Sequence, residues 1–183
     1  MNLRQTKISG VLIVETTSFK DHRGAFSRLY CEQELSEVMG KRRIVQINHS
    51  RNINKGAVRG LHYQQPPYAE MKLIRCLKGR IWDVAVDLRM DSPSFLQWHA
   101  EELSGDNLKM MVIPEGCAHG FQVLELDSEL LYLHSEFYNP AAESGVRHDD
   151  PCIGITWPLP VVDISTRDCQ HPLIPKDFLG IKL

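Results

Sequence analysis

The sequence lacks long apolar runs, repeats and blocks of like charge. Its 183 residues include 21 Lys or Arg and 23 Asp or Glu, for a formal net charge of -2. A chain balanced in this way does not have the basic footprint of a nucleic-acid or membrane-surface binder. No stretch approaches the ~20 apolar residues of a membrane span. The apolar run at 11–14 is too short for the core of a signal peptide. We therefore expect a cytoplasmic protein that binds neither nucleic acid nor membrane.

Cysteine is sparse and unpaired. The five cysteines are widely spaced and form no Cys-x-x-Cys pair, which indicates neither a disulfide framework nor a zinc knuckle. We expect them to be reduced, and unpaired cysteines are usually small buried hydrophobic side chains. A reactive thiol stays open only at Cys117, which lies in a segment rich in chemistry-bearing residues.

The composition is that of one ordinary folded domain, with 43% hydrophobic and 24% charged residues, so we treat residues 1–183 as a single domain. Gly and Pro recur about every eight to twelve residues, the spacing of an all-β sandwich or barrel. The β-branched and aromatic runs predict strands at 11–15, 44–48, 72–77, 80–88, 108–113, 121–126 and 129–134. Only 32–39 is predicted to be helical.

The clearest predicted strand, 80–88, places two carboxylates on one face. Alternation puts Asp83 and Asp87 opposite Trp82. If the face with the carboxylates lines a barrel, Asp83 needs a polar partner there. Asp87 lies near the strand end and is expected to reach solvent.

Three segments, 59–64, 114–121 and 165–168, concentrate histidine, arginine and glycine at predicted strand edges or turns. The pattern Pro114-x-Gly116-x-x-His119 is similar to the second motif of the cupin barrel. Residues 60–64 stand where the first cupin motif would carry His-x-His, but here His62 is followed by Gln64. Two histidines are too few nitrogen ligands for the tight ion site of a metal-binding cupin. We expect no metal and no cofactor.

Further motifs follow one another along the chain from about residue 19 to about residue 168. They are Phe19-x-Asp21-x-Arg23-Gly24-x-Phe26, Gln46-x-Asn48-x-Ser50, Arg59-Gly60-Leu61-His62-x-Gln64, Lys72-Leu73, Asp83-Val84-Ala85-Val86-Asp87-x-Arg89-x-x-Ser92-Pro93, Ile113-Pro114-Glu115-Gly116-x-Ala118-His119-Gly120-Phe121 and Trp157-Pro158. In this order they resemble the dTDP-4-dehydrorhamnose 3,5-epimerase family. The resemblance implies an all-β, cupin-like jelly-roll β-barrel with a few short helices.

The resemblance also implies a reaction. Members of this family epimerise C3 and C5 of a dTDP-linked 4-keto-6-deoxy sugar without a cofactor, converting dTDP-4-dehydro-6-deoxy-D-glucose to dTDP-4-dehydro-L-rhamnose. A base removes the proton next to the ketone, and an acid returns one to the opposite face. The ketone stabilises the carbanion as an enolate, which requires donors for the oxyanion. The product would enter dTDP-rhamnose, deoxysugar and surface-polysaccharide biosynthesis.

The resemblance assigns three catalytic residues. His62 matches the general base, and an ordinary imidazole is mostly neutral near pH 7 and can accept a proton. Asp168 matches the carboxylate that fixes its tautomer, as in a serine-protease triad. Tyr132 matches the acid that delivers the proton to the other face.

Further residues match contacts to the substrate. Lys72 and His119 resemble groups around the sugar and its 4-keto oxygen, with Asp83 as the hydrogen-bond partner of His119. The other residues at positions that contact pyrophosphate, nucleotide or sugar in the family are Arg23, Phe26, Arg28, Gln46, Asn48, Arg59, Tyr138, Glu143 and Arg167. In the family the stretch 19–28 reaches into the neighbouring subunit, which implies a homodimer with exchanged N-terminal strands.

Three positions depart from the family pattern. Cys117 stands where an aromatic residue is usual, Leu133 where a lysine is frequent, and Arg28 where a glutamate is frequent. Arg28 adds positive charge near the nucleotide, and Leu133 removes it near Tyr132. These departures leave open a 3-only or 5-only epimerase, or one acting on a 4-keto sugar carried by another nucleotide.

Two readings from other classes are also open. A non-catalytic nucleotide-sugar-binding cupin would keep the barrel without turnover, although His62, Asp168 and Tyr132 are all present. A metal-dependent cupin such as an oxygenase would need an ion at His62 and His119, and Gln64 argues against it.

Overall fold

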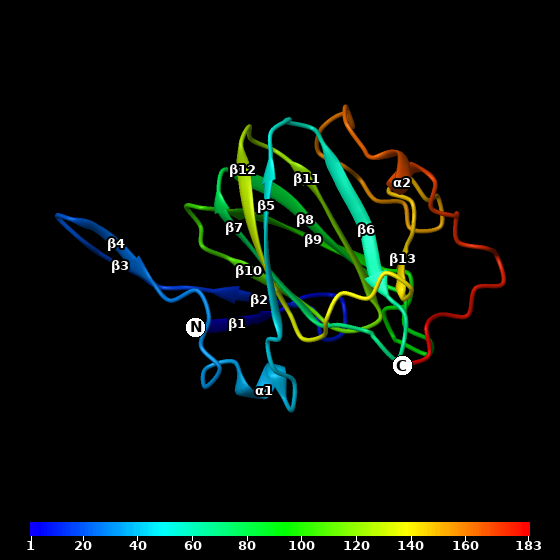
Figure 1. Ribbon diagram of the computed structural model, residues 1–183, viewed down its shortest axis with the longest axis horizontal. Helices are drawn as coiled ribbons and strands as arrows, with labels where there is room; N and C mark the ends of the chain where they lie inside the picture. Colours follow the sequence, from blue (N-terminus) through cyan, green and yellow to red (C-terminus); the bar gives the residue numbers. More distant parts are fainter.

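A computed structural model describes residues 1–183. Two antiparallel sheets dominate it, with a hairpin projecting to one side (Figure 1). The larger sheet has six strands in the order β1-β2-β10-β7-β12-β5. Their bounds are β1 (Asn2–Gln5), β2 (Leu12–Glu15), β5 (Gln46–Asn52), β7 (Lys72–Lys78), β10 (Met110–Ile113) and β12 (Ser128–His134).

The smaller sheet has five strands in the order β13-β6-β11-β8-β9. Their bounds are β6 (Val58–Gln64), β8 (Arg80–Asp87), β9 (Trp98–Ser104), β11 (Cys117–Val123) and β13 (Glu143–Gly145). The two helices, α1 (Ser36–Met39) and α2 (Thr166–Cys169), have one turn each. The prediction of an all-β, cupin-like jelly roll with a few short helices is confirmed. No helix has the length and apolar character needed to span a bilayer.

All seven predicted strands overlap observed ones, but the segment 59–64 was placed wrongly. It forms most of β6 instead of a strand edge. Glycine has a low strand propensity, so Gly60 weakens the sequence signal for this strand. The structure explains why a glycine is needed there. A Cβ there would lie 2.6 Å from the carbonyl oxygen of His119 on the adjacent strand β11. The glycine therefore allows the two site-bearing strands to approach each other closely. The seven predicted ranges also missed strands β1, β3, β4, β9 and β13, and the predicted helix 32–39 shortens to α1.

The main core lies between the sheets. Ile13, Ile74 and Met111 from the larger sheet pack with Ile81 and Phe121 from the smaller one. A second apolar cluster covers the outer face of the smaller sheet. In that cluster, Val84 and Val86 meet the C-terminal residues Ile174 and Ile181. Strand β8 is therefore buried on both faces.

Burial on both faces contradicts the prediction for Asp87. Its side chain is fully buried, and its carboxylate accepts hydrogen bonds from Arg89, Ser92 and Ser94. These three partners lie two to seven residues after Asp87 in the chain, and the turn that follows β8 therefore folds back over the carboxylate that was expected to reach solvent. Cys117 is also buried, at the start of β11, and burial raises the pKa of its thiol to about 12. The possibility of a reactive thiol at Cys117 is therefore wrong.

Strands β3 (Ser18–Asp21) and β4 (Gly24–Ser27) form a separate hairpin that projects from the body like an arm (Figure 1). Its two aromatic side chains, Phe19 and Phe26, are 69% and 70% exposed. A two-stranded hairpin is marginally stable by itself in water, and exposed aromatic side chains add to its cost. The arm therefore needs a surface to pack against.

The root of the arm is held by a buried arginine. Arg75 on β7 is fully buried and donates to Thr16 Oγ1 and the Leu29 carbonyl, each at 3.0 Å, and also to the Leu108 carbonyl. Thr16 and Leu29 flank the arm on either side. Burial lowers the pKa of Arg75 to about 10, and no carboxylate lies in ion-pair contact with it. The arm is thus anchored at both ends by one cation bound to neutral oxygen atoms.

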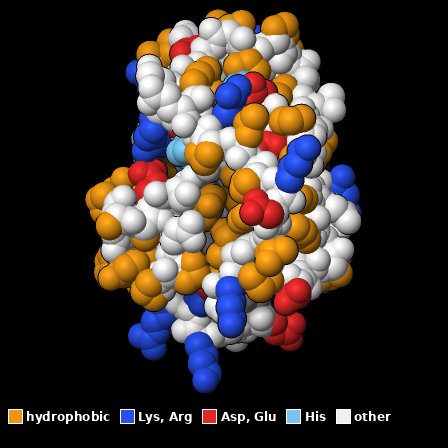
Figure 2. All heavy atoms as spheres, turned by 90° about the vertical axis from the view of Figure 1, so that its right-hand side faces the viewer, with side chains coloured by type: hydrophobic (Ala, Val, Ile, Leu, Met, Phe, Trp, Pro, Cys, Tyr) orange, Lys and Arg blue, Asp and Glu red, His pale blue; other side chains and the backbone are white.

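The surface carries both signs of charge. Basic and acidic side chains are mixed with scattered hydrophobic ones on the face shown in Figure 2. The mixture of charges on this face agrees with the small net charge of the chain, and no extended basic patch is seen on it.

Candidate active site

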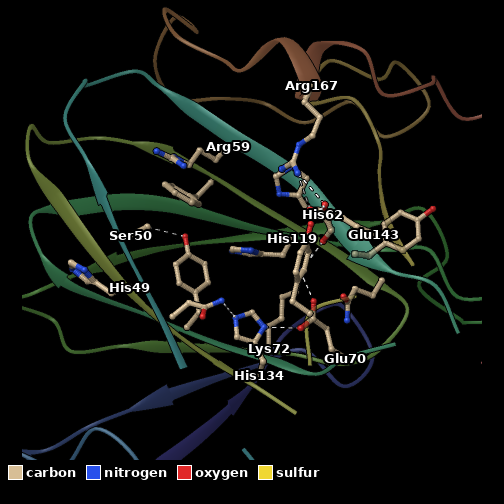
Figure 3. A pocket seen from close by; sticks show the side chains of 16 residues that line it. His49, Ser50, Arg59, His62, Glu70, Lys72, His119, His134, Glu143 and Arg167 are labelled. Atoms are coloured by element: carbon tan, nitrogen blue, oxygen red, sulfur yellow. Dashed lines mark hydrogen bonds and ion pairs between the residues drawn. The ribbon is translucent and has the colours of Figure 1, made fainter. Parts of the chain in front are cut away.

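A polar cavity of about 320 Å³ opens between the two sheets (Figure 3). Strand register brings its side chains together. His62 on β6 faces His119 on β11, and Lys72 on β7 faces His134 on β12. Tyr132 on β12 faces Asn48 on β5. The predicted residues that line the cavity are Asn48, Arg59, His62, Lys72, His119, Tyr132, Tyr138, Glu143 and Arg167.

His62 and Asp168 form a dyad at the wall of this cavity. His62 Nε2 lies 2.8 Å from Asp168 Oδ1, and the Gly60 N–H donates to Asp168 Oδ2 at 3.0 Å. Burial alone would raise the pKa of Asp168, but the hydrogen bonds from His62 and Gly60 outweigh it and hold the pKa well below its usual range. The carboxylate is therefore ionised. It favours the tautomer with hydrogen on Nε2, which leaves Nδ1 as the basic nitrogen.

Local structure places Asp168. Ser165 is the N-cap of α2, and its hydroxyl oxygen accepts from the Asp168 N–H at 3.1 Å. The cap fixes the first turn of the helix, so the buried carboxylate is directed at β6.

A second histidine–carboxylate pair lies beside the first. His119 Nε2 is 2.7 Å from Asp83 Oδ1, and both side chains are buried. Burial raises the pKa of Asp83, against the opposing charge of His119. Asp83 thus lies on the inward face and has the partner that the alternation in 80–88 required.

The phenol of Tyr132 is the third feature of the cavity. Its hydroxyl shares a hydrogen bond with Ser50 Oγ at 3.2 Å, drawn as the dashed line from Ser50 in Figure 3. Its ring meets His119 edge-on, with centroids 6.1 Å apart. Burial raises the pKa of Tyr132 above its ordinary value. The phenol therefore keeps its proton at neutral pH and can act as a donor.

Charged and aromatic groups gather at the mouth of the cavity. The Tyr138 hydroxyl donates to Glu143 Oε2 at 2.7 Å, and Arg167 pairs with the same carboxylate at 3.0 Å. Gln46 does not line the cavity; its side-chain oxygen accepts from the Tyr138 N–H at 3.1 Å and so supports the tyrosine backbone. Tyr138 is 53% exposed, which leaves its ring free to stack on a ligand.

Besides Gln46, three predicted substrate contacts lie outside the cavity of this chain. Arg23 and Phe26 are on the arm; Arg23 pairs with Asp21 at 2.7 Å. Arg28 lies just after the arm and pairs with Glu34. Leu133 needs a correction, because it packs among Leu73 and Met71 on the opposite face of β12 from Tyr132. The leucine therefore does not change the charge beside the phenol.

The sequence reading missed Glu70 and His134, and it quoted Ser50 in a motif without giving it a role; all three line the cavity. His134 could have been found by alternation, because it is two residues after Tyr132 in the predicted strand 129–134. Glu70 lies before β7, and Ser50 lies beyond the end of the predicted strand 44–48.

His171 was also missed, and no periodic signal marks it. Its ring meets that of His62 edge-on with centroids 5.7 Å apart, and it packs against Gly145, where a Cβ would lie 2.4 Å from the ring. Donor atoms of His62, Asp168 and His171 lie within 4.8 Å of one another, close enough to surround an ion. However, the Arg167 guanidinium lies 3.2 Å from His62 Nε2 and 3.5 Å from Asp168 Oδ1. A fixed positive charge there repels a cation, so the group is poorly suited to a metal.

Comparisons with known proteins agree with one another. Residues 5–176 match the sequence profile of a family described as dTDP-4-dehydrorhamnose 3,5-epimerase. A protein of that name from Shigella flexneri is 43% identical over 184 residues, covering 100% of this chain and 96% of the relative.

Solved structures give the same result. A dTDP-4-dehydrorhamnose 3,5-epimerase from Elizabethkingia anophelis superposes with a TM-score of 0.91 at 37% identity, covering 97% of this chain and 98% of that one. A dTDP-6-deoxy-D-glucose-3,5-epimerase from Legionella pneumophila, in complex with dTDP-4-keto-L-rhamnose, also gives 0.91 at 37% identity, covering 98% and 97%.

Proposed function

The chain belongs to the dTDP-4-dehydrorhamnose 3,5-epimerase family and is an isomerase; we propose how its residues carry out the reaction. Residues 1–183 form a single cupin-like domain that converts dTDP-4-dehydro-6-deoxy-D-glucose to dTDP-4-dehydro-L-rhamnose. The reaction inverts C3 and C5 through proton transfers alone and uses no cofactor.

His62 is the general base. The dyad with ionised Asp168 supports this role, because the carboxylate fixes the ring and stabilises the imidazolium that forms when the proton leaves carbon. Removing the proton at C3 or C5 gives an enolate whose negative charge resides on the 4-oxygen. Lys72 and His119, which line the same cavity, are the donors for that oxyanion.

Tyr132 is the acid. Its buried phenol stays protonated, and it lines the cavity together with His62. In the proposed cycle, the base takes the proton from one face of the sugar and the phenol gives a proton to the other face, which inverts the carbon. Before the second carbon reacts, the phenolate takes up a proton from solvent and the His62 imidazolium releases to solvent the proton that it took from carbon.

The nucleotide lies at the mouth of the cavity. Arg59 and Arg167 suit the pyrophosphate, because a guanidinium fork matches paired phosphate oxygens. The exposed ring of Tyr138 suits stacking on the base. Asn48, and Glu143 once released from Arg167, supply further polar contacts.

The active form is a homodimer with exchanged arms. Exposed Phe19 and Phe26 support this proposal, as does the separation of Arg23 and Phe26 from the cavity of their own chain. A second copy could receive the arm, with its aromatic and cationic side chains, at the nucleotide end of its own cavity. Five free cysteines support a reducing, cytoplasmic location.

The proposed reaction rests on one observation: His62, bound to a carboxylate, and the protonated phenol of Tyr132 line the same cavity. It is tested by proton NMR of dTDP-4-keto-6-deoxyglucose with chelator-treated protein in deuterated water. The proposal requires loss of both the C3 and the C5 proton signals. Loss of one signal alone indicates a single-site epimerase. Retention of both signals, with binding intact, indicates a nucleotide-sugar-binding protein without turnover.

A further inference from the structure

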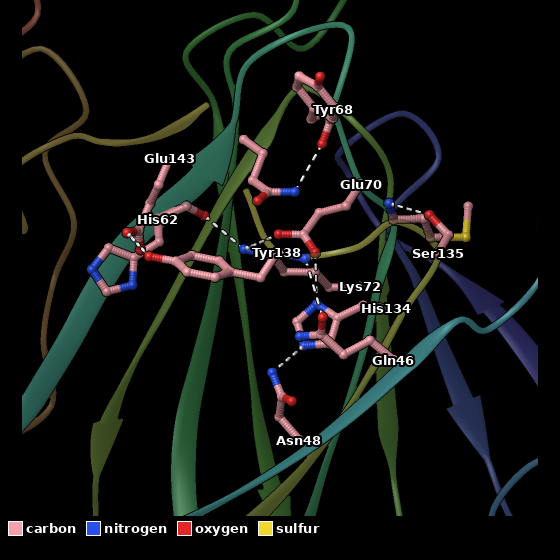
Figure 4. A network of polar contacts seen from close by, with 12 residues as sticks. Gln46, Asn48, His62, Tyr68, Glu70, Lys72, His134, Ser135, Tyr138 and Glu143 are labelled. Carbon is pink, nitrogen blue, oxygen red and sulfur yellow. Dashed lines mark hydrogen bonds and ion pairs between the residues drawn. The ribbon is translucent and has the colours of Figure 1, made fainter. Parts of the chain in front are cut away.

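Lys72 belongs to a buried network that the proposed reaction does not explain (Figure 4). Its ammonium donates to the His62 carbonyl at 3.1 Å and pairs with Glu70 Oε1 at 3.2 Å. The first contact crosses from the larger sheet to the smaller one and ends on the backbone of the proposed base. Lys72 is therefore held at two points, and one of them is a carboxylate.

Both oxygens of that carboxylate are occupied. Glu70 Oε2 lies 2.6 Å from His134 Nδ1, so Glu70 stands between Lys72 and His134 in Figure 4. Burial alone would raise the pKa of Glu70, but the hydrogen bond from His134 and the charge of Lys72 outweigh it and the pKa is lowered. The network thus contains a permanent anion within the cavity wall, where a negatively charged enolate must form.

His134 completes the network on its other side. Its Nε2 lies 3.3 Å from Asn48 Nδ2. The tautomer with hydrogen on Nδ1 satisfies both contacts, because Nδ1–H donates to Glu70 and the Asn48 amide donates to Nε2. His134 consequently links Asn48 to Lys72 through Glu70.

A carboxylate at this place disfavours the negative charge that develops on the 4-oxygen of the enolate, so its presence needs another explanation. The purpose that fits the geometry is placement. A lysine side chain is long and flexible, and alone it would sample many rotamers. Two fixed acceptors, the Glu70 carboxylate and the His62 carbonyl, restrict the ammonium to one position while leaving its remaining N–H free for the cavity.

We infer that Glu70 and His134 are positioning residues: Glu70 holds the Lys72 ammonium beside His62, and His134 fixes both Glu70 and the Asn48 amide. The inference rests on the proposed function for its kinetic consequences. Its geometric part, the placement of Lys72, holds without it.

The test compares Glu70→Ala with Glu70→Gln. The alanine variant removes the acceptor, so kcat should fall about 10- to 100-fold while KM changes little, because Lys72 acts on charge present only in the transition state. The glutamine variant keeps an oxygen acceptor of the same reach and should hold kcat within about threefold of wild type. Equal losses in both variants, or a rise in KM with unchanged kcat, would overturn the inference.

His134→Ala separates the two functions of the histidine. It should lower kcat through Glu70 and raise KM through Asn48, whereas Glu70→Ala should affect kcat alone. An unchanged KM in His134→Ala would contradict the part assigned to Asn48.

Glu101 offers a matched control. It pairs with Lys109 and with Arg4 and lies 3.7 Å from His99 on β9, outside the cavity. Glu101→Ala removes the same kind of lysine–carboxylate–histidine contact and should leave kcat and KM unchanged. A loss there equal to that of Glu70→Ala would point to a general structural effect.

Crystal structures of the two Glu70 variants would show the position of the Lys72 ammonium directly, without an activity assay. The Lys72 ammonium should leave the His62 carbonyl in Glu70→Ala and stay beside it in Glu70→Gln. If the wild-type protein does not turn over the nucleotide sugar, the proposed function fails, and these structures still decide the placement. An ammonium that remains in position in Glu70→Ala would refute it.

Discussion

His62 and His119 face each other across β6 and β11, yet each imidazole is bound to a carboxylate from a different element. Asp168 comes from α2 and is held ionised, whereas burial raises the pKa of Asp83 on β8. Two neighbouring histidines are thus placed in different electrostatic surroundings. This difference suits one to accept a proton and the other to donate a hydrogen bond.

Replacing the base should abolish exchange at every carbon. His62→Ala is expected to retain the C3 and C5 proton signals in deuterated water, because no other group at the cavity replaces the imidazole. Asp168→Asn should keep some exchange but lose about 100-fold or more in kcat, because the ring loses its tautomer control. Similar, mild losses in both variants would contradict the roles assigned to the dyad.

Replacing the acid should separate exchange from inversion. In Tyr132→Phe, His62 can still remove and return a proton, so deuterium enters the sugar while little epimer forms. Since burial raises the pKa of Tyr132 above its ordinary 10.0, the phenol stays protonated as the pH rises. The ratio of wild-type to Tyr132→Phe inversion rates should therefore stay constant from pH 7 to about 10. A ratio that falls within this range would show the phenol ionising there.

Gly60→Ala should destabilise the fold. A Cβ at this position would lie 2.6 Å from the His119 carbonyl and 2.7 Å from Gly120 Cα, and its φ is +108°. The free energy of unfolding in urea should fall by about 2 kcal/mol or more, because two backbones must separate. Gly154→Ala, with φ +65° and its nearest atom at 4.0 Å, isolates the backbone strain and should cost about 1 kcal/mol. Equal costs would show that the close approach of β6 and β11 is not needed.

Exchanged arms predict complementation between two defective proteins. His62→Ala keeps an intact arm, and an Arg23→Ala/Phe26→Ala double variant keeps an intact cavity. Unfolding and refolding the two together makes about half of the dimers mixed, each with one complete site, so about a quarter of wild-type activity should return. Refolding each variant alone is the control. If the double variant is fully active by itself, the arm takes no part in catalysis.

The local sequence pattern predicted the strands better than it predicted which residues line the cavity. Asp83 was found because alternation along one strand is a local property, and the same rule would have found His134. The pairing of His62 with Asp168 joins residues 106 positions apart, and only the family resemblance suggested it. Strand β6 was not predicted because Gly60, which allows the close approach of β6 to β11, weakens the strand pattern of the sequence. Asp87 was misjudged because the turn after β8 folds back and places Arg89, Ser92 and Ser94 on its carboxylate, which strand alternation does not predict.

The anchoring of the arm by Arg75 has a consequence for assembly. Because Thr16 and Leu29 are fastened to the same guanidinium, the hairpin leaves the body in a set direction before any second copy arrives. In the proposed dimer, the second copy meets a strand pair that has already lost much of its conformational freedom, so the entropy lost on association is smaller. Freeing the root with Arg75→Met should weaken the dimer without altering a single residue of the contact surface.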